Sequence, residues 1–273
     1  MVRRGSTTKR AAQLRPRCSL TDKLVCAVLR GALGFAVSSA LFGTTVFAAQ
    51  EGHWTYQGAE GPEHWGELDQ DSAICASGRQ QSPIDLAAPV SARLEGISLS
   101  WNTGAWSVTN NGHTLQVNTP DGGSAIIDGE AYELTQFHFH TPSEHTIDGV
   151  RSALEAHFVH ANANGDLAVI GVMMQPGQGN DLFSRIMTAA PRQEGERPVG
   201  SIVNPRELIS ATEHFLRYQG SLTTPPCSEI VVWTVLETPV TVSQSDIDAF
   251  AALFPMNARP LQDAYRRFIL TSD

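Results

Sequence analysis

Two histidine-bearing segments with the two-residue period of a β-strand place the tightest constraint on how this 273-residue chain can fold. Residues 136–140 read Gln-Phe-His-Phe-His, so His138 and His140 project from one face of a strand while the phenylalanines project from the other. Residues 155–160 read Glu-Ala-His-Phe-Val-His and place His157 at the matching alternation. The pattern predicts two neighbouring strands that carry imidazoles on one shared face.

The pairing of these strands decides whether the imidazoles meet. A turn at Asp148-Gly149 puts His140 opposite His157 and His138 opposite Val159. The connection is long enough to shift this register, but any even shift keeps the three histidines on one face. Three converging imidazoles without a fourth protein ligand are typical of a catalytic zinc site, whose open tetrahedral position is left for water.

The other histidines have no such geometry. A single His-x-His pair is also compatible with ordinary surface or core residues, and that alternative stays open from spacing alone. His145 and His160 lack the matching face and are interpreted as structural, while His53, His64 and His214 have no case from spacing.

Most of the remaining pattern is β. Residues 113–118 and 125–127 are predicted to form a hairpin around a turn at 120–123. Two further strands, 153–160 and 167–174, are expected to join across Asn164-Gly165.

The segment 229–236 is almost wholly apolar, which favours a central strand buried on both faces. Short helices are predicted at 181–188 and at 246–254, the second with Ser245 and Asp248 as a capping box. The expected class is therefore mainly β (α+β), with short peripheral helices.

The N-terminal segment, residues 1–49, resembles an export signal more than a domain. A basic leader is followed by an apolar stretch from Leu24 to Ala48 that ends in small residues. An uncleaved membrane anchor is the alternative, because residues 31–49 form an uncharged run barely long enough to span a bilayer. We expect cleavage, a domain at 50–273, and export, most simply to a bacterial periplasm.

Charge narrows the partners of the domain. Residues 1–49 hold 8 of the 19 basic and 1 of the 28 acidic residues, which leaves 50–273 with 11 basic and 27 acidic residues and a net charge of −16. Such a domain repels nucleic acid and anionic lipid, so neither is expected as a partner. The absence of lysine after Lys23 also excludes Schiff-base and P-loop chemistry.

Cysteine usage is compatible with export. Cys75 and Cys227 are the two cysteines of the predicted domain, and in an exported chain they most simply pair. Two separate buried thiols are the alternative.

Six segments resemble the alpha carbonic anhydrase family, in the family's order and at compatible spacing. They are Gln80–Asp85, Asn110–His113, Gln136–His140, Ser143–Thr146, Glu155–His160 and Gly220–Pro226. The resemblance begins at His53 and extends to about Phe268. It implies a large twisted, mostly antiparallel sheet with a metal at the bottom of a conical cleft.

The resemblance implies a function for the histidines. His138, His140 and His157 match the ligands of one Zn²⁺ that makes a nucleophile from water near neutral pH. The implied reaction is reversible hydration of carbon dioxide to bicarbonate by zinc-bound hydroxide. Thr223 matches the gatekeeper that accepts the hydroxide proton and donates its own to Glu144. Without the family match, Glu144 reads as a solvated loop carboxylate.

The resemblance also implies supporting residues. His113 matches the proton shuttle, although its Asn-Asn-Gly-His string is otherwise an ordinary turn. The implied holders of the relay waters are Tyr56, Asn111 and Gln116, and the implied partners of the ligand imidazoles are Gln136, Glu155 and, through its backbone, Asn257. The implied apolar wall for carbon dioxide comprises Val159, Val169, Leu222, Val231 and Trp233, with Thr224 and Tyr218 as hydrogen-bond partners near the gate.

Further implications concern bonds and partners. By resemblance, Cys75 and Cys227 form the disulfide of the family's exported members, and Ser82-Pro83 and Pro225-Pro226 are cis. Sulfonamides and anions are expected inhibitors, and a homodimer is left open. Departures at Thr141-Pro142 and Asn257-Ala258-Arg259 suggest a bacterial or algal branch.

Two other functions are weighed. Relatives that lose a ligand histidine serve as binding modules, but all three histidines are present here. A cupin-type metalloenzyme would use Glu144 as a fourth ligand, and it needs a second histidine motif that the sequence does not offer.

Overall fold

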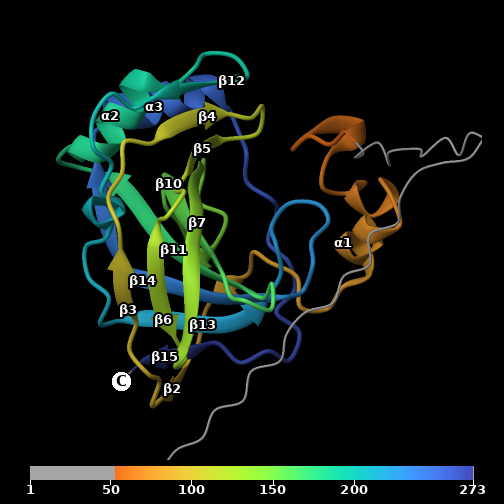
Figure 1. Cartoon of the computed structure of the whole chain (residues 1–273). Helices are drawn as coiled ribbons and strands as arrows, with labels where there is room; N and C mark the ends of the chain where they lie inside the picture. Colours follow the sequence, from red (N-terminus) through yellow and green to blue (C-terminus); the bar gives the residue numbers. More distant parts are fainter. Residues whose placement is uncertain (1–52, 273) are drawn as a thin grey trace, which may run out of the picture. The chain divides into compact units, whose positions relative to one another are not determined.

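A large mixed sheet organises residues 53–272, the part of the chain that the computed structural model describes (Figure 1). The strands are β1 Asp85–Leu86, β2 Val90–Ala92, β3 Ser98–Trp101, β4 Ser107–Asn110, β5 Leu115–Asn118, β6 Gly123–Ile127, β7 Glu130–His140, β8 Thr146–Ile147, β9 Val150–Arg151, β10 Leu154–Ala161, β11 Leu167–Pro176, β12 Gly195–Pro198, β13 Phe215–Gly220, β14 Val231–Val242 and β15 Leu270–Ser272. The predicted export segment lies outside the described residues.

The main sheet has twelve strands in the described region. Ten of them follow the order β12-β4-β5-β7-β10-β11-β14-β13-β15-β2, while β6 pairs with β7 and β3 pairs with β6. Strands β1, β8 and β9 form a separate small sheet. Within the main sheet only the β11–β14 and β15–β2 pairs are parallel. The predicted class, a large twisted and mostly antiparallel sheet, is confirmed.

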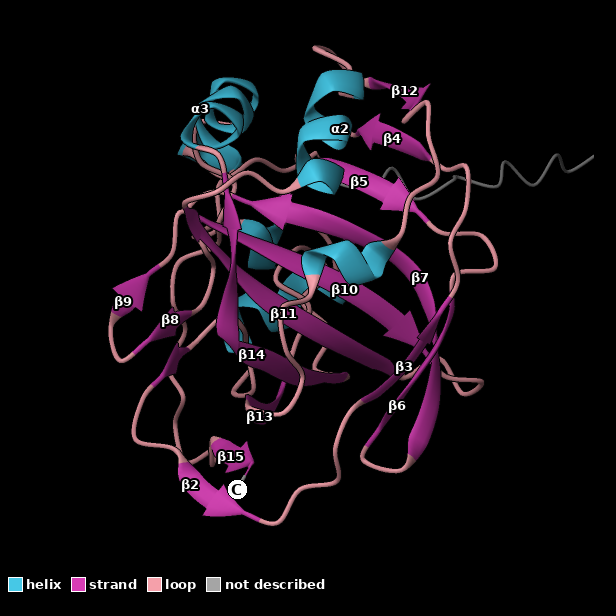
Figure 2. Ribbon diagram, turned by 90° about the vertical axis from the view of Figure 1, so that its left-hand side faces the viewer, coloured by secondary structure: helices cyan, strands magenta, loops and turns pink. Residues whose placement is uncertain are grey.

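Helices are short and peripheral. They are α1 Ile74–Ser77, α2 Asp181–Ala189 and α3 Gln244–Leu253, together with 3₁₀ turns at Gly58–Glu60, Trp65–Glu67, Asp71–Ala73 and Pro205–Leu208. Helices α2 and α3 lie together at the end of the sheet near β4 and β12 (Figure 2). No helix in the described part of the chain is long and apolar enough to cross a membrane.

The second predicted helix begins earlier than expected. Its N-cap is Ser243, whose hydroxyl accepts a hydrogen bond from the backbone N–H of Asp246 at 3.1 Å. The predicted capping box at Ser245 and Asp248 is therefore wrong, because the chain leaves β14 directly into the helix and the first available hydroxyl takes the cap.

The predicted hairpin of residues 113–127 is also wrong. Strands β5 and β6 do not pair with each other but lie along the same edge of β7, β5 against residues 136–138 and β6 against residues 130–133. The actual two-residue turn is Asp128-Gly129, where both residues have positive φ. An Asp-Gly turn of this type matches strand twist, and the eleven-residue β7 is long enough to accept both partners.

The other strand predictions are confirmed. Strands β10 and β11 form an antiparallel hairpin around Gly165. The apolar segment becomes β14, which lies inside the sheet between β11 and β13. It is parallel to β11 and antiparallel to β13.

The two faces of β7 and β10 have different surroundings. On one face, Phe139 packs against Phe183 of α2 and Phe250 of α3, with ring centroids 5.0 and 6.2 Å apart. Phe137 and Phe158 are fully buried in the same core cluster. This aromatic core fixes the two strands, and His138, His140 and His157 occupy the opposite face.

Candidate metal centre

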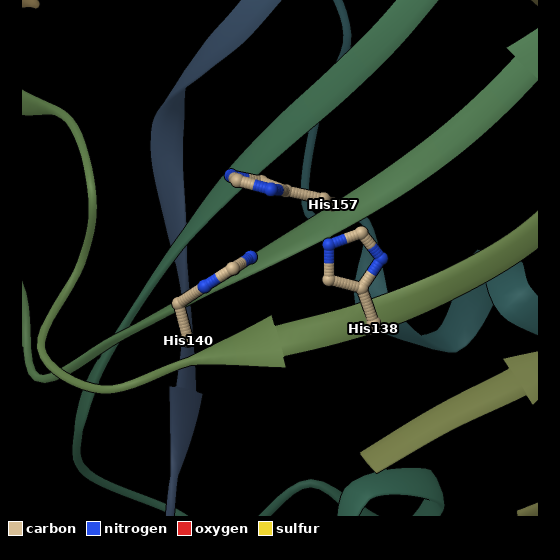
Figure 3. Close-up of side chains that lie close together, drawn as sticks. All are labelled: His138, His140 and His157. Carbon is tan, nitrogen blue, oxygen red and sulfur yellow. The ribbon is translucent and has the colours of Figure 1, made fainter. Parts of the chain in front are cut away.

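Three imidazoles converge on the face of the sheet opposite the aromatic core. In the β7–β10 pairing His157 lies opposite His138 and Glu155 opposite His140. The register differs by two residues from the expected one, and this even shift keeps the three rings on one face as predicted. Figure 3 shows the three rings pointing toward one another from the two strands, and their ligand nitrogens all lie within 4.8 Å of one another.

Each ring has a partner that occupies one nitrogen. The Nδ1 of His138 lies 2.8 Å from Oε1 of Gln136, and the Nδ1 of His140 lies 2.7 Å from the backbone oxygen of Asn257. The Nε2 of His157 lies 2.9 Å from Oε1 of Glu155. Because these three oxygens are hydrogen-bond acceptors, the ring nitrogen opposite each of them carries the proton. The lone pairs therefore sit on Nε2 of the first two rings and Nδ1 of the third.

This tautomer pattern suits a cation. The Nε2 of His140 is buried without a hydrogen-bond partner, which is costly unless a metal ion accepts its lone pair. Burial lowers the pKa of His138 well below its usual value, and it also lowers the pKa of His140; the neighbouring imidazoles act in the same direction. Neutral rings are the form that binds metal. The donor set of three imidazole nitrogens fits Zn²⁺.

Glu144 lies beside this centre. Its side chain is fully buried, and Oε1 accepts a hydrogen bond from the backbone N–H of Arg259 at 2.8 Å. Its Oε2 has no hydrogen-bond partner and lies 3.6 Å from Nε2 of His140. The alternative of a solvated loop carboxylate is therefore wrong. No hydrogen bond links Glu144 to Thr223 within residues 53–272, although Thr223 is also buried.

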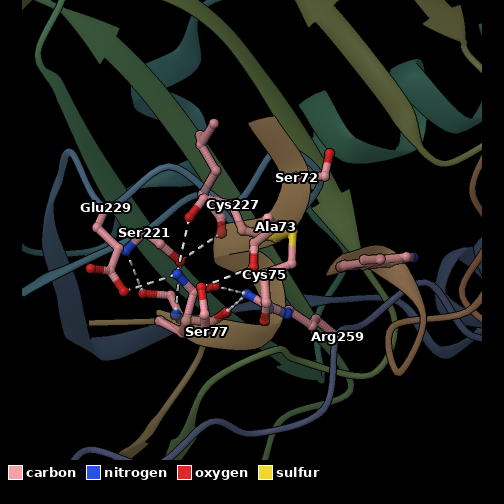
Figure 4. Close-up of a disulfide and its surroundings, with 12 residues drawn as sticks. Ser72, Ala73, Cys75, Ser77, Ser221, Cys227, Glu229 and Arg259 are labelled. Carbon is pink, nitrogen blue, oxygen red and sulfur yellow. Dashed lines mark hydrogen bonds between the residues drawn. A yellow bond between two sulfur atoms is a disulfide. The ribbon is translucent and has the colours of Figure 1, made fainter. Parts of the chain in front are cut away.

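A disulfide fixes the loop that carries Thr223. Cys75 and Cys227 are bonded, as the resemblance implied (Figure 4). Arg259 strengthens the same junction, because its guanidinium donates to the backbone oxygen of Cys75 at 3.0 Å. The Ser82-Pro83 and Pro225-Pro226 bonds are cis as expected, and Thr141-Pro142 is a third cis bond.

The implied apolar wall forms a continuous surface. Val159, Val169, Leu222, Val231 and Trp233 belong to one hydrophobic cluster, separate from the aromatic core. Val159, Val169 and Trp233 are direct neighbours across β10, β11 and β14. The Trp233 ring lies 4.8 Å from that of His157, which places the wall next to the centre. Thr224 is half-buried in the adjoining loop.

His113 lies in a short loop between β4 and β5. The side-chain oxygen of Asn111 accepts hydrogen bonds from the backbone N–H groups of His113 and Thr114, at 3.0 and 2.9 Å. Gly112, between Asn111 and His113, has a φ of +86°. The imidazole stacks on the indole of Trp54 at a centroid distance of 3.7 Å and an angle of 8°. The Asn111 bonds thus fix the loop backbone, and the stacking on Trp54 holds the imidazole.

Three of the four implied relay residues line one pocket. The pocket, of about 540 Å³, is lined by His113, Asn111 and Tyr56, and also by Glu194 from the loop before β12. Burial lowers the pKa of His113 and His53 adds to this, while Glu194 opposes it. Gln116 faces His138 across β5 and β7. His113, Asn111 and Tyr56 therefore share this pocket, and Gln116 lies next to a candidate ligand.

Several functional contacts were not predicted. His145, interpreted as structural, is tied to the centre, because its Nδ1 lies 2.8 Å from Oε1 of Glu155 and its Nε2 lies 2.6 Å from the Tyr218 hydroxyl. His145 therefore holds the carboxylate of Glu155, which in turn bonds to the ring of His157. Trp54 and Glu194 were missed as well, since no local spacing points to a contact with a loop so distant in sequence.

Comparison with known proteins agrees with this geometry. The sequence profile of eukaryotic-type carbonic anhydrase matches residues 60–272. A carbonic anhydrase of Pectobacterium carotovorum is 40% identical over 220 residues, covering 80% of this chain and 90% of the relative. That of Nostoc sp. is 40% identical over 248 residues, covering 87% and 94%.

Solved structures point to the same family. The alpha-carbonic anhydrase of Thermovibrio ammonificans, determined with the inhibitor sulfanilamide, aligns with a TM-score of 0.78 at 38% identity, covering 80% of this chain and 99% of that one. The sequence profile, the relatives and the fold thus agree, and the chain belongs to the eukaryotic-type, or alpha, carbonic anhydrase family of enzymes.

Proposed function

We propose that this protein hydrates carbon dioxide reversibly at a zinc ion held by His138, His140 and His157. The single observation that carries the proposal is the convergence of three imidazole nitrogens whose opposite nitrogens are all engaged. Zinc bound there would lower the pKa of a water molecule so that a nucleophile forms near neutral pH. Carbon dioxide hydration is the general reaction of the family.

The chain's own groups would orient the reactants. Glu144 is an acceptor when ionised, and its Oε2, which has no hydrogen-bond partner and lies 3.6 Å from Nε2 of His140, would accept a hydrogen bond from the Thr223 hydroxyl. Such a one-way hydrogen bond would fix the direction of the nucleophile's lone pair. The wall around Val159, Val169 and Trp233 offers an apolar resting place for carbon dioxide.

Each turnover must also release a proton. His113 would carry that proton from the relay waters to bulk buffer, because an imidazole titrates near neutral pH. Its position in the loop of Asn111, stacked on Trp54 and facing an open pocket, supports this role. We assign Tyr56, Asn111 and Gln116 to the water path between His113 and the metal.

The test is stopped-flow hydration of carbon dioxide by the purified protein, before and after treatment with a zinc chelator. Activity should disappear with the metal and return with added Zn²⁺. His157→Ala should lose both zinc and activity, whereas the surface variant Glu196→Gln should keep both. Activity that persists after complete zinc removal would refute the proposal, and copurified iron or manganese would favour the cupin-type alternative.

An aromatic sulfonamide supplies an independent test. The Thermovibrio ammonificans relative was solved with sulfanilamide, and we propose that the same compound class inhibits this protein through its metal. A fluorescent sulfonamide should bind to the wild type and be displaced by sulfanilamide, and it should not bind to His157→Ala, which lacks the metal.

We also propose that the protein is exported to a periplasm after cleavage near residue 49. The basic and apolar N-terminal segment and the Cys75–Cys227 disulfide support this location, because disulfides persist in oxidising compartments. N-terminal sequencing of protein from a periplasmic fraction tests it. A protein that stays with the membrane and keeps its first residues would indicate an anchor instead.

A further inference from the structure

The three-residue segment Asn257–Arg259, which follows α3, contacts several parts of the candidate site. The backbone oxygen of Asn257 holds Nδ1 of His140, and the backbone N–H of Arg259 holds Oε1 of Glu144. The Arg259 guanidinium donates to the backbone oxygen of Cys75. A segment with so many partners determines how these parts lie relative to one another.

The side-chain amide of Asn257 extends this network to the relay loop, the segment 111–114 that carries His113. Its Nδ2 donates to the backbone oxygens of His113 at 2.9 Å and Phe139 at 3.0 Å, and its Oδ1 accepts from the backbone N–H of Thr141 at 2.6 Å. An amide has two N–H donors, and both are used. The side chain is 1% exposed, so water cannot replace these bonds.

One amide therefore joins the backbone of His113 to the strand that carries two candidate metal ligands. Phe139 lies between His138 and His140 in β7, and Thr141 follows them. The distance that a proton must travel from the metal to the relay imidazole depends on how these two backbones are held.

We propose that the Asn257 side chain is a positioning residue for proton release, which holds the His113 loop at a fixed distance from the metal centre. This rests on the proposed function. It is distinct from the contact of the Asn257 backbone with His140, because the backbone oxygen is present whatever the side chain. A side-chain variant therefore separates the relay from metal binding.

Asn257→Ala removes three hydrogen bonds and leaves the His113 loop without this anchor. A displacement of about 1 Å in a reacting geometry can cost up to 100-fold in rate, and we expect kcat in dilute buffer to fall roughly tenfold. The value of kcat/KM, which reports carbon dioxide conversion before the proton leaves, should change little. Added imidazole should restore most of the lost kcat.

A double-mutant cycle with His113→Ala tests the proposed route. If Asn257 acts through His113, then Asn257→Ala should cause no further loss of kcat once the relay imidazole is gone. Asn180→Ala is the matched control, because Asn180 also bonds two backbone groups, at the start of α2, but lies away from the site. It should leave kcat and its buffer dependence unchanged.

Three outcomes would overturn the inference. These are an additive loss in the double variant, an unchanged kcat in the Asn257→Ala protein, and loss of zinc from that protein. If Asn257→Ala does not fold, the nearly isosteric Asn257→Asp, which keeps an acceptor for Thr141 and removes both donations, must show the same buffer-rescued defect. If the wild type binds zinc and hydrates carbon dioxide but the double-mutant cycle is additive, only the inference about Asn257 is refuted. If the wild type is inactive, the proposed function is refuted.

Discussion

Replacing Glu155 by glutamine tests how the metal centre is oriented. The buried carboxylate accepts three N–H groups: Oε1 lies 2.9 Å from Nε2 of His157 and 2.8 Å from Nδ1 of His145, and Oε2 lies 2.9 Å from the backbone N of His145. Glutamine keeps the shape but offers one acceptor oxygen and an NH₂ group. In either orientation of the amide, a donor then faces a donor.

The size of the effect follows from these contacts. If the NH₂ faces the imidazoles, His157 is driven to carry its proton on Nδ1, the nitrogen that faces His138 and His140. If it faces the backbone instead, the N–H of His145 is buried unpaired. Loss of such an orienting partner commonly lowers metal affinity about 10- to 100-fold, or about 1.4 to 2.7 kcal/mol. We expect Glu155→Gln to fall in the upper half of this range.

Zinc affinity is measured by competition with a chromophoric chelator, with circular dichroism as the check on folding. Gln136→Ala is the matched comparison, because Gln136 has one contact, to Nδ1 of His138, and its loss should weaken zinc binding less. A folded Glu155→Gln protein that binds zinc as tightly as the wild type would refute the argument that this carboxylate fixes the tautomer of His157.

Three other predictions concern protons. His113→Ala should keep zinc but slow turnover in dilute buffer, with rescue by imidazole; full activity in dilute buffer would exclude the relay role. Glu194→Gln should lower the pKa of His113 further, because the carboxylate of Glu194 raises that pKa. Hydration kcat should then fall about threefold for each unit by which the pKa of His113 falls. The control Glu196→Gln, at an exposed residue, should leave kcat unchanged. Burial lowers the pKa of His160 from 6.5 to about 4. Between pH 6.5 and about pH 4 the unfolded state therefore binds more protons than the folded state. The free energy of unfolding should fall by about 3 kcal/mol as pH falls through this range. His160→Gln should flatten that loss in acid unfolding followed by fluorescence, and an unchanged slope would contradict it.

The candidate ligands could be predicted from sequence because their placement depends on parity alone. The expected pairing was two residues out, yet the three histidines still shared a face, since an even shift leaves alternation intact. The 113–127 hairpin depended instead on which strand pairs with which. Local turn residues at 120–123 could not show that both arms would lie along β7.

Contacts between distant segments left no local signal. Glu194 reaches the relay loop from beyond α2, and the side chain of Asn257 bonds to His113 across 144 positions of sequence. Similarity to a family supplied the backbone role of Asn257, but its side-chain bonds follow only from coordinates. His145 was missed for a related reason, because its alternation shows no link to a ligand and its function is to hold Glu155.

The arrangement separates two mechanical requirements. A metal site needs ligands held within a fraction of an ångström, and here they alternate along β7 and β10 with Phe137, Phe139 and Phe158, which are locked in the largest core cluster. The proposed proton relay would need access to solvent, and His113 lies in a loop at a pocket. Loops are less precisely held than strands, so a buried tie to the ligand strand is needed to keep the two in reach of each other. Asn257 is where the structure provides that tie.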